Sequence, residues 1–328
     1  MEKIRWGIIG TGKIAKAFSK GLSFLPDAEL VAIGSRSADS ANRFGDEFGV
    51  PHRHANYASL VEDSDVDVVY IATPHAVHEE NMLLCLDAGK AVLCEKPFTI
   101  NMTQAKTVID MARRKKLFLM EAMWTRYIPL MVRLRELIAE GVIGELKMLE
   151  IGMGFIAPRD NNSLYFFNPQ MGGGILLDGG SYAVSLASMI FRTPPARIVS
   201  MAYIGEPGVD EQTVIIFGYE GDPMAVLYLS FNTRIPPAFR IMGSKVRITI
   251  HPPLFNPTRM TITNADQDDE IIEIPFEGNG YNYEIAEVMR CLRESKLESE
   301  VMPLDETIEI MQTLDQIRAQ WNLKYPME

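Results

Sequence analysis

The sequence predicts an α/β protein: a doubly wound parallel sheet in the N-terminal part of the chain, followed by an α+β domain with a large, open, mostly antiparallel sheet. Three observations support this. Apolar runs alternate with helix-compatible segments through the first 120 residues, a glycine-rich turn follows the first run, and extended segments dominate the second half. Strands that alternate with helices in this way imply right-handed crossovers and a parallel sheet.

Composition agrees with two globular domains and argues against several classes of protein. A chain of 328 residues is too long for one ordinary core, and we predict domains at 1–121 and 122–328. The formal net charge of −11 argues against a nucleic-acid partner, because phosphate binding needs a basic surface. The N-terminus has no signal-peptide pattern, and no apolar run approaches the roughly 20 residues that cross a bilayer. Three scattered cysteines without metal-binding spacing suggest reduced thiols, so we expect a cytoplasmic protein without membrane contact.

The first domain is expected to hold parallel strands that are nearly continuous apolar runs. Strands covered on both faces by helices have this composition. They are expected at residues 4–10, 29–37, 66–74, 91–97 and 117–122. Helices are expected between and after them, at 13–22, 39–49, 78–89 and 101–116.

The second domain is expected to be mainly extended. Helices are predicted at 128–140 and at about 174–191, and two more close the chain. Strands are predicted at 146–155, 197–205, 212–220, 224–232, 244–251, 259–264 and 270–276. In one of them, Val246, Ile248 and Ile250 alternate with polar residues. That alternation is typical of a sheet with one face wet or covered by a partner.

The glycine-rich turn has the pattern G-x-G-x-x-A, with glycines at 10 and 12 and Ala15 at its end. Alone the pattern is weak, but here it lies between a strand and a helix, the context of a dinucleotide-binding Rossmann turn. The first glycine permits the tight turn, and the second lets the backbone approach a pyrophosphate at the helix N-terminus. The alternative is a plain strand-to-helix turn. Predicted cofactor contacts here are Gly10, Thr11, Gly12, Lys13 and Ile14.

The end of the second strand favours NADP over NAD. NAD-binding sites usually place an acidic residue there for the ribose 2′-hydroxyl. This chain has Ser35, Arg36 and Ser37 instead. A guanidinium binds a 2′-phosphate bidentately, and hydroxyls donate to it. The alternative is that Arg36 stacks on adenine and NAD is also accepted.

The fourth strand ends in Glu95, Lys96 and Pro97. Ligands of doubly wound sheets bind at the carboxyl ends of the strands, so Lys96 is expected to point into the cofactor crevice. Proline at this place makes a rigid or cis turn. The alternative is a surface lysine beside a turn. We predict cofactor contacts from all three residues.

A second segment, MGGGILLDGGSY, places Asp178 four residues before Tyr182. On a helix this spacing puts both side chains on one face. A tyrosine with a pKa near 10 is a poor base at neutral pH, and an ammonium such as that of Lys96 would lower this pKa. The alternatives are an interfacial tyrosine and a surface or capping acid, and spacing alone does not choose between them.

The segments AVLCEKP, LFLMEAMWTRYIP and GGGILLDGGSY resemble the Gfo/Idh/MocA oxidoreductase family, over essentially the whole chain. Within it they most resemble the branch of dimeric dihydrodiol dehydrogenases and NADP-dependent D-xylose dehydrogenases. The resemblance implies Lys96, Asp178 and Tyr182 as catalytic residues, with the tyrosine as acid/base. It also implies a cis peptide before Pro97 and a homodimer through the open face of the C-terminal sheet. One departure is Gly180, where relatives often have a larger residue.

Two further groups are expected near the cofactor. Thr73, Pro74, His75 and His78 follow the third strand, and Trp124 and Arg126 follow the fifth. His75 and His78 have a spacing that suits a metal on a helix, but no third ligand lies nearby, and hydride transfer needs no metal. We therefore expect no metal. Aromatic residues such as Trp124 could stack on a sugar or an arene, or simply pack between the domains.

These patterns predict an NADP-dependent oxidoreductase that transfers hydride between nicotinamide and a small sugar, polyol or vicinal diol. The first alternative is a non-catalytic NADP-binding sensor, which would not need the lysine, aspartate and tyrosine that this chain retains. The second is an enzyme that keeps its nicotinamide bound and uses it in an internal redox cycle. Retention of cofactor through gel filtration would favour the second.

Overall fold

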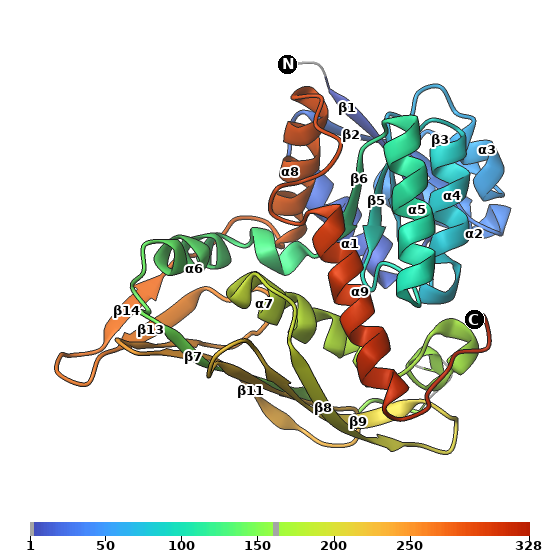
Figure 1. Cartoon of the computed structure of the whole chain (residues 1–328). Coiled ribbons are helices and arrows are strands. Elements are labelled where there is room, and N and C mark those ends of the chain that lie inside the picture. The colour runs from blue at the N-terminus through green and yellow to red at the C-terminus, as the bar shows by residue number, and fades with distance from the viewer. Residues whose placement is uncertain (1–2, 160–163) are drawn as a thin grey trace. The chain divides into compact units, whose positions relative to one another are not determined.

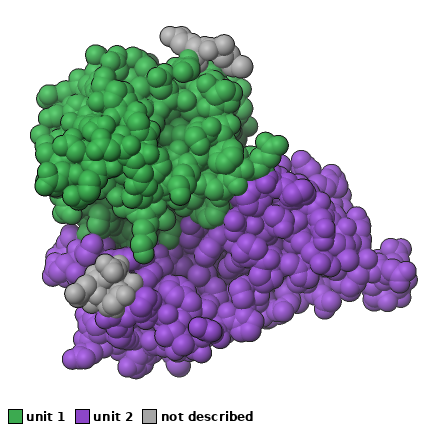
Figure 2. All heavy atoms as spheres, turned by 180° about the vertical axis from the view of Figure 1, so that it is seen from behind, with its two compact units in different colours: residues 1–127, 277–308 green, residues 128–276, 309–328 purple. Residues whose placement is uncertain are grey.

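The computed structural model describes residues 3–159 and 164–328, which form two compact units (Figures 1 and 2). Unit 1 comprises residues 1–127 and 277–308, and unit 2 comprises residues 128–276 and 309–328. This division differs from the predicted boundary because a segment near the C-terminus returns to the first unit. In that segment, helix α8 (Tyr281–Arg293) packs against α1 (Lys13–Leu22).

The described part of unit 1 contains a six-stranded, all-parallel sheet in the order β3-β2-β1-β4-β5-β6. Its strands are β1 (Ile4–Ile9), β2 (Ala28–Gly34), β3 (His52–His54), β4 (Val68–Ile71), β5 (Ala91–Glu95) and β6 (Leu119–Ala122). The order reverses between β1 and β4, which confirms the predicted doubly wound sheet. Crevices beside such a reversal, at the carboxyl ends of the strands, bind ligands. The short edge strand β3 was missing from the prediction.

Helices cover this sheet. Besides α1 and α8 they are α2 (Ala38–Phe48), α3 (Tyr57–Val61), α4 (His78–Asp87) and α5 (Met102–Lys115). Figure 1 shows α4 and α5 side by side, and α4 packs on β5. All residues of β4 and β5 are buried, as their apolar composition predicted.

The described part of unit 2 contains an eight-stranded sheet in the order β14-β13-β12-β11-β7-β10-β9-β8. Its strands are β7 (Leu146–Gly154), β8 (Arg197–Ile204), β9 (Asp210–Gly218), β10 (Met224–Ser230), β11 (Ile235–Gly243), β12 (Arg247–Ile250), β13 (Arg259–Thr263) and β14 (Glu270–Glu273). Among the described strands of this sheet, only β7 and β10 pair in parallel, so the prediction of a mostly antiparallel sheet is confirmed. Strand β11 was not predicted.

One face of this sheet is apolar and exposed at the β8–β9–β10 end. Val199, Met201 and Tyr203 on β8 are 65%, 77% and 59% exposed. Val214 and Ile216 on β9 are also exposed, while the residues that alternate with them are buried. The expected alternation between a covered and an open face is therefore present.

The helices of unit 2 include α6 (Pro129–Ala139) and α7 (Ser181–Phe191), and α9 (Leu304–Ala319) runs from residues of unit 1 into unit 2. The expectation that no apolar run approaches membrane-spanning length is wrong for residues Pro169–Phe191. They form a helical stretch of 23 residues with a mean hydropathy of 1.4 in its most apolar window, and 83% of that window is buried inside the structure. Such burial is typical of a core helix.

Candidate active site

The glycine turn after β1 has the backbone that a dinucleotide-binding turn requires. Gly10 has a φ of +105°, and a Cβ there would lie 2.5 Å from the carbonyl oxygen of Ala72. Gly12 is the N-cap of α1, and a Cβ on it would meet no atom of the described residues within 4 Å. Gly10 therefore has to be glycine for the turn itself, whereas Gly12 leaves room for a ligand.

The start of α1 suits a phosphate group. Where the chain is described, no side chain caps the first turn of this helix, so its N–H groups point toward the space beside Gly12. A helix N-terminus of this kind attracts anions through its N–H groups and its dipole. Ile14 is 43% exposed in the same turn, while Ala15 is fully buried against the sheet. Lys13 is exposed and Thr11 is partly exposed.

The end of β2 presents Arg36 to solvent beside two serines. Ser35 is buried and its N–H donates to the carbonyl of His54 at 3.0 Å. Ser37 caps α2, with its hydroxyl accepting from Ser40 N–H at 3.4 Å. Burial raises the pKa of Tyr57, and Arg36 partly opposes this, so the phenol and the guanidinium lie near one another. Sequence reasoning missed Tyr57 because it follows the unpredicted strand β3.

The His78 ring lies between backbone carbonyls that follow β4 and β5, and in its neutral form it donates to one of them. His78 is fully buried, with Nε2 2.9 Å from the Thr73 carbonyl oxygen and Nδ1 2.9 Å from the Pro97 carbonyl oxygen. Burial lowers the pKa of His78 despite these bonds. The prediction placed its ring against cofactor phosphate or solvent, whereas the structure encloses it among backbone carbonyls. Thr73 also accepts a hydrogen bond from Asn81 at 3.0 Å.

Lys96 lies at the carboxyl end of β5, half-buried, and its peptide bond to Pro97 is cis, as the resemblance implied. The preceding Glu95 is buried, and its carboxylate accepts hydrogen bonds from the Tyr70 hydroxyl and from Lys96 N–H. Burial, together with the Glu95 carboxylate, raises the pKa of Tyr70 well above its usual value, so this phenol stays a donor. Glu95 therefore holds the backbone that carries Lys96.

Two further buried carboxyl groups lie in unit 1. Glu284 on α8 is fully buried, and neither carboxylate oxygen has a hydrogen-bond partner among the residues described. Burial, and then the charge of Glu95, raise the pKa of Glu284 well above its usual range. Burial likewise raises the pKa of Glu121 to about 7, although Thr307 donates to it. No local pattern in the sequence marked these residues, because their neighbours are distant along the chain.

Trp124 and Arg126, beyond β6, are held by the C-terminal segment of unit 1. The Trp124 ring stacks on Tyr281, with centroids 4.8 Å apart and planes within 5° of parallel. Arg126 is 1% exposed, and it donates to Glu306 at 2.6 Å and to the Val301 carbonyl at 3.0 Å. Direct contact of either residue with the cofactor stays a prediction.

Asp178 lies in a π-helical turn (Leu176–Gly180), not in the regular α-helix expected there. The first residue of this turn is held by a hydrogen bond, because Leu176 N–H donates to the buried carboxyl group of Asp210 at 2.7 Å. Just before it, Gly174 has a φ of +112°, and a Cβ there would overlap Asp210 Oδ1. Tyr325, from the C-terminal tail, donates to the Gly173 carbonyl at 2.8 Å. Asp210 and Tyr325 thus position the turn that carries Asp178.

Tyr182 is the second residue of α7, which directly follows this π-helical turn. It is 7% exposed, and its ring packs against Phe255 with centroids 4.2 Å apart. A π-helical turn is wider than an α-helical turn, so the two side chains lie slightly less than one turn apart.

The structure thus collects the predicted cofactor residues at the carboxyl edge of the unit 1 sheet. It also places Asp178 and Tyr182 on one helical segment of unit 2. Pro74 and His75 join the first group after β4, where His75 begins a short 3₁₀-helix. The meeting of Lys96 with Asp178 and Tyr182 stays a prediction.

Family models match both parts of the chain. One, described as the oxidoreductase family, NAD-binding Rossmann fold, matches residues 4–123. The other, described as the GFO/IDH/MocA C-terminal domain, matches residues 131–249. The chain therefore belongs to the Gfo/Idh/MocA family, which confirms the predicted family and the prediction of an oxidoreductase.

Similar proteins of named activity match over nearly full length. A trans-1,2-dihydrobenzene-1,2-diol dehydrogenase of Mus musculus is 35% identical, with 99% of both chains covered. A D-xylose 1-dehydrogenase (NADP(+)) of Hypocrea jecorina is 33% identical, with 98% of this chain and 93% of that one covered. Among solved structures, a 3-ketoreductase from Actinomadura kijaniata in complex with NADP and TDP-benzene has a TM-score of 0.86. It is 25% identical, and 97% of this chain and 98% of that one are covered.

Proposed function

We propose that Lys96, Asp178 and Tyr182 are the catalytic residues of this oxidoreductase, with Tyr182 as the acid/base. The chain is an NADP-dependent oxidoreductase that acts on a sugar, polyol or vicinal diol, as the sequence predicted and as its relatives indicate. The observation that carries the proposal is local. In each unit, a buried carboxyl group fixes the backbone next to a proposed catalytic residue: Glu95 next to Lys96, and Asp210 before Asp178.

The residues of unit 1 fit NADP. Gly10 and Gly12 leave the backbone approach that a pyrophosphate needs, and the first turn of α1 offers its N–H groups. Arg36 lies exposed at the end of β2, where a 2′-phosphate would be bound. When bound, the nicotinamide supplies hydride transfer.

The side chains of the protein handle the proton. In the oxidation direction, the Tyr182 phenolate takes the proton of the reacting substrate hydroxyl, and in reduction the phenol returns it. The Lys96 ammonium favours the phenolate form and stabilises negative charge on the reacting oxygen. Asp178 accepts a hydrogen bond from a substrate hydroxyl or orients the ammonium.

Kinetics of single variants test this assignment. Aldoses, polyols and diols are screened with NADP and with NAD by the absorbance of the reduced cofactor, and the best substrate is used for the variants. We expect Tyr182→Phe and Lys96→Met to lower kcat by roughly 10²–10⁴-fold. NADP affinity, measured by fluorescence titration, should remain within a few-fold for Tyr182→Phe.

A matched control is Tyr219→Phe. Tyr219 is a buried tyrosine of unit 2 that stacks on Phe191 at the far end of α7. This variant should keep the kcat of the wild type. Normal turnover by Tyr182→Phe would exclude the proposed acid/base role.

The exposed apolar face of β8 and β9 supports the predicted homodimer, because contiguous exposed apolar residues mark interaction sites. Light scattering after gel filtration should give twice the chain mass for the wild type and for Asp268→Lys, which lies in an exposed turn between β13 and β14. It should give the chain mass for Met201→Glu. If Met201→Glu remains a dimer, the dimer interface does not include this face of β8 and β9.

The cysteines support a reducing compartment. Cys85, Cys94 and Cys291 are buried and free thiols, and burial raises the pKa of Cys291 to about 12. Neutral, enclosed thiols react slowly with oxidants. A cytoplasmic location follows as part of the proposal.

A further inference from the structure

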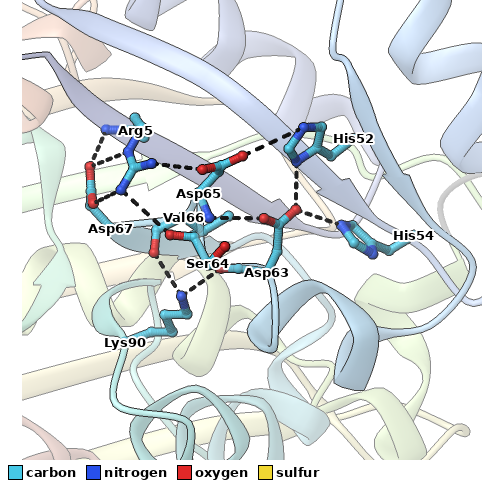
Figure 3. Close-up of polar contacts among 9 residues, drawn as sticks. All are labelled: Arg5, His52, His54, Asp63, Ser64, Asp65, Val66, Asp67 and Lys90. Carbon is cyan, nitrogen blue, oxygen red and sulfur yellow. Dashed lines mark hydrogen bonds and ion pairs between the residues drawn. The ribbon is translucent and has the colours of Figure 1, made fainter.

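We propose that His52, Asp63 and Asp65 bind a divalent transition-metal ion such as Zn²⁺ at the edge of the unit 1 sheet, with His54 holding Asp63 in place. His52 and His54 lie on the edge strand β3, and the two aspartates lie between α3 and β4 (Figure 3). This cluster is separate from His75 and His78, the pair that the sequence suggested and that we did not assign to a metal.

Ligand atoms from the three side chains converge. His52 Nδ1 lies 2.7 Å from Asp63 Oδ2, and His52 Nε2 lies 3.9 Å from Asp65 Oδ2. One ligand atom from each side chain falls within 4.8 Å of those from the other two. Zinc bonds of about 2.0–2.2 Å place neighbouring ligand atoms of a tetrahedral ion roughly 3.3 Å apart. Small side-chain rotations therefore bring all three groups onto one ion, and water completes the shell.

His54 supports the site from the other side of Asp63. It lies two residues after His52, so both side chains point to the same face of the strand. His54 Nε2 is 3.1 Å from Asp63 Oδ2. Carboxylates that bind metals are usually held by outer hydrogen bonds of this kind, which fix their orientation.

The loop that carries the aspartates is already fixed. The Lys90 ammonium donates to the carbonyls of Asp63 and Val66 at 2.6 and 2.8 Å. Asp65 N–H donates to Asp63 Oδ1 at 2.9 Å. Arg5 donates to Asp65 Oδ1 at 2.9 Å, which leaves Oδ2 of that carboxylate turned toward His52. Figure 3 shows these bonds. Because the ligands are held beforehand, little ordering is needed when the ion binds.

Charge and access also suit a cation. Burial acts to raise the pKa of Asp63, but hydrogen bonds from Asp65 N–H, His52 and His54 outweigh it and lower this pKa. The carboxylate is therefore ionised at neutral pH, as a metal ligand must be. The His52 and Asp65 side chains are 38% and 53% exposed, so an ion can reach them from solvent. Imidazole nitrogen with carboxylate oxygen is a donor set that zinc accepts.

The test uses the full chain without a histidine tag, stripped by chelator and titrated with ZnCl₂ in a calorimeter. We expect a single ion per chain at about pH 7.5, and weaker binding as the pH is lowered, because protons compete with the metal for its ligands. His52→Gln should abolish binding, and His54→Gln should weaken it by about 10- to 100-fold. Zinc should raise the Tm of the wild type but not that of His52→Gln.

His251→Gln is the matched control. This histidine lies in unit 2, with Nε2 2.7 Å from Thr261 Oγ1, and its replacement should leave zinc binding unchanged. Far-UV circular dichroism checks that the variants fold. If His52→Gln does not fold, the proposal is tested on the wild type instead. Zinc should then protect His52 from modification by diethylpyrocarbonate, measured by peptide mapping. Zinc binding that survives in His52→Gln, or absence of protection in the wild type, overturns the proposal.

Discussion

Each unit buries a carboxyl group next to a proposed catalytic residue, and the two groups are satisfied differently. In unit 1, one oxygen of Glu95 accepts from the Tyr70 hydroxyl and the other from Lys96 N–H. In unit 2, Asp210 Oδ2 accepts from Leu176 N–H. The second oxygen, Asp210 Oδ1, has no partner within the described ranges.

The two groups therefore differ in how their oxygens are satisfied. Both oxygens of Glu95 accept a hydrogen bond, whereas one oxygen of Asp210 does not, among the residues described. Burial raises the pKa of Asp210 to about 8, although the N–H groups of Leu176 and Asp210 itself act to lower it. Asp210 is therefore mostly a neutral acid at pH 7. Unit 1 thus holds the segment of Lys96 through a carboxyl group with both oxygens hydrogen-bonded, and unit 2 holds the segment of Asp178 through a largely neutral acid.

The largest effect is expected from Gly174→Ala, which removes the Asp210 support altogether. A Cβ at this position overlaps Asp210 Oδ1, and a φ of +112° is itself unfavourable for alanine. We expect a loss of roughly 3 kcal/mol or more in the free energy of unfolding, measured with urea. Gly208→Ala is the control, because Gly208 has a φ of +85° and a Cβ there meets no described atom within 4 Å.

The control should lose only about 1 kcal/mol, the cost of the backbone conformation alone. Equal losses in the two variants would mean that Asp210 does not hold Gly174 in place.

Strands β3 and β11 show where sequence patterns stop predicting this fold. Strand β3 has the sequence His-Arg-His, which is too short and too polar to be recognised as a strand. Strand β11 contains Pro236 and Pro237, which normally exclude a strand. Its pairing with β7 is irregular between Ile235 and Ala238, where the two prolines lie, so the sheet accommodates them at a break in the ladder. Long apolar strands, by contrast, were predictable because burial alone dictates their composition.

The residues of the candidate site also fall into two groups, those that the sequence predicted and those that it did not. The sequence predicted the places of Gly10, Gly12 and Lys96, because each lies directly after a strand that its apolar composition identifies. Asp210 and Glu284 were not, because each acts on residues far away in sequence, and a buried acid has no local signature. The π-helical turn at Leu176–Gly180 escaped prediction for the same reason, since the bond that starts it comes from β9.

An intermediate effect is expected from exchanging each acid for its amide. In Glu95→Gln, the amide NH₂ faces either Lys96 N–H, which only donates, or the Tyr70 hydroxyl, which can accept from it but then loses the Glu95 acceptor of its own O–H, so one hydrogen bond is lost in either case. We expect a loss of about 1–3 kcal/mol in the free energy of unfolding. Displacement of Lys96 should also lower kcat by roughly 10- to 100-fold. Urea unfolding and steady-state kinetics measure the two effects.

Asp210→Asn is the matched exchange in unit 2. At about pH 4, where Asp210 is protonated in the folded protein and substantially so in the unfolded protein, it replaces a neutral acid with a neutral amide that still accepts from Leu176 N–H, so stability should change by less than about 1 kcal/mol. If both exchanges cost the same at this pH, the inferred difference between the hydrogen bonding of the two groups is wrong.

The effect that is smallest at acid pH, and that grows as the pH rises, is a change in the pH dependence of stability. A carboxyl group whose pKa is about 8 in the folded protein and near 3.8 when unfolded binds more protons in the folded state between these values. Its contribution to stability is therefore fully present below about pH 4 and is lost as the pH rises toward 8. The slope for one such group approaches about 1.4 kcal/mol per pH unit. Asp210→Asn should remove this slope, so that in urea unfolding the stability of the variant rises progressively above that of the wild type between about pH 4 and 8. Parallel stability curves for the two proteins would show that Asp210 is ionised in the native state.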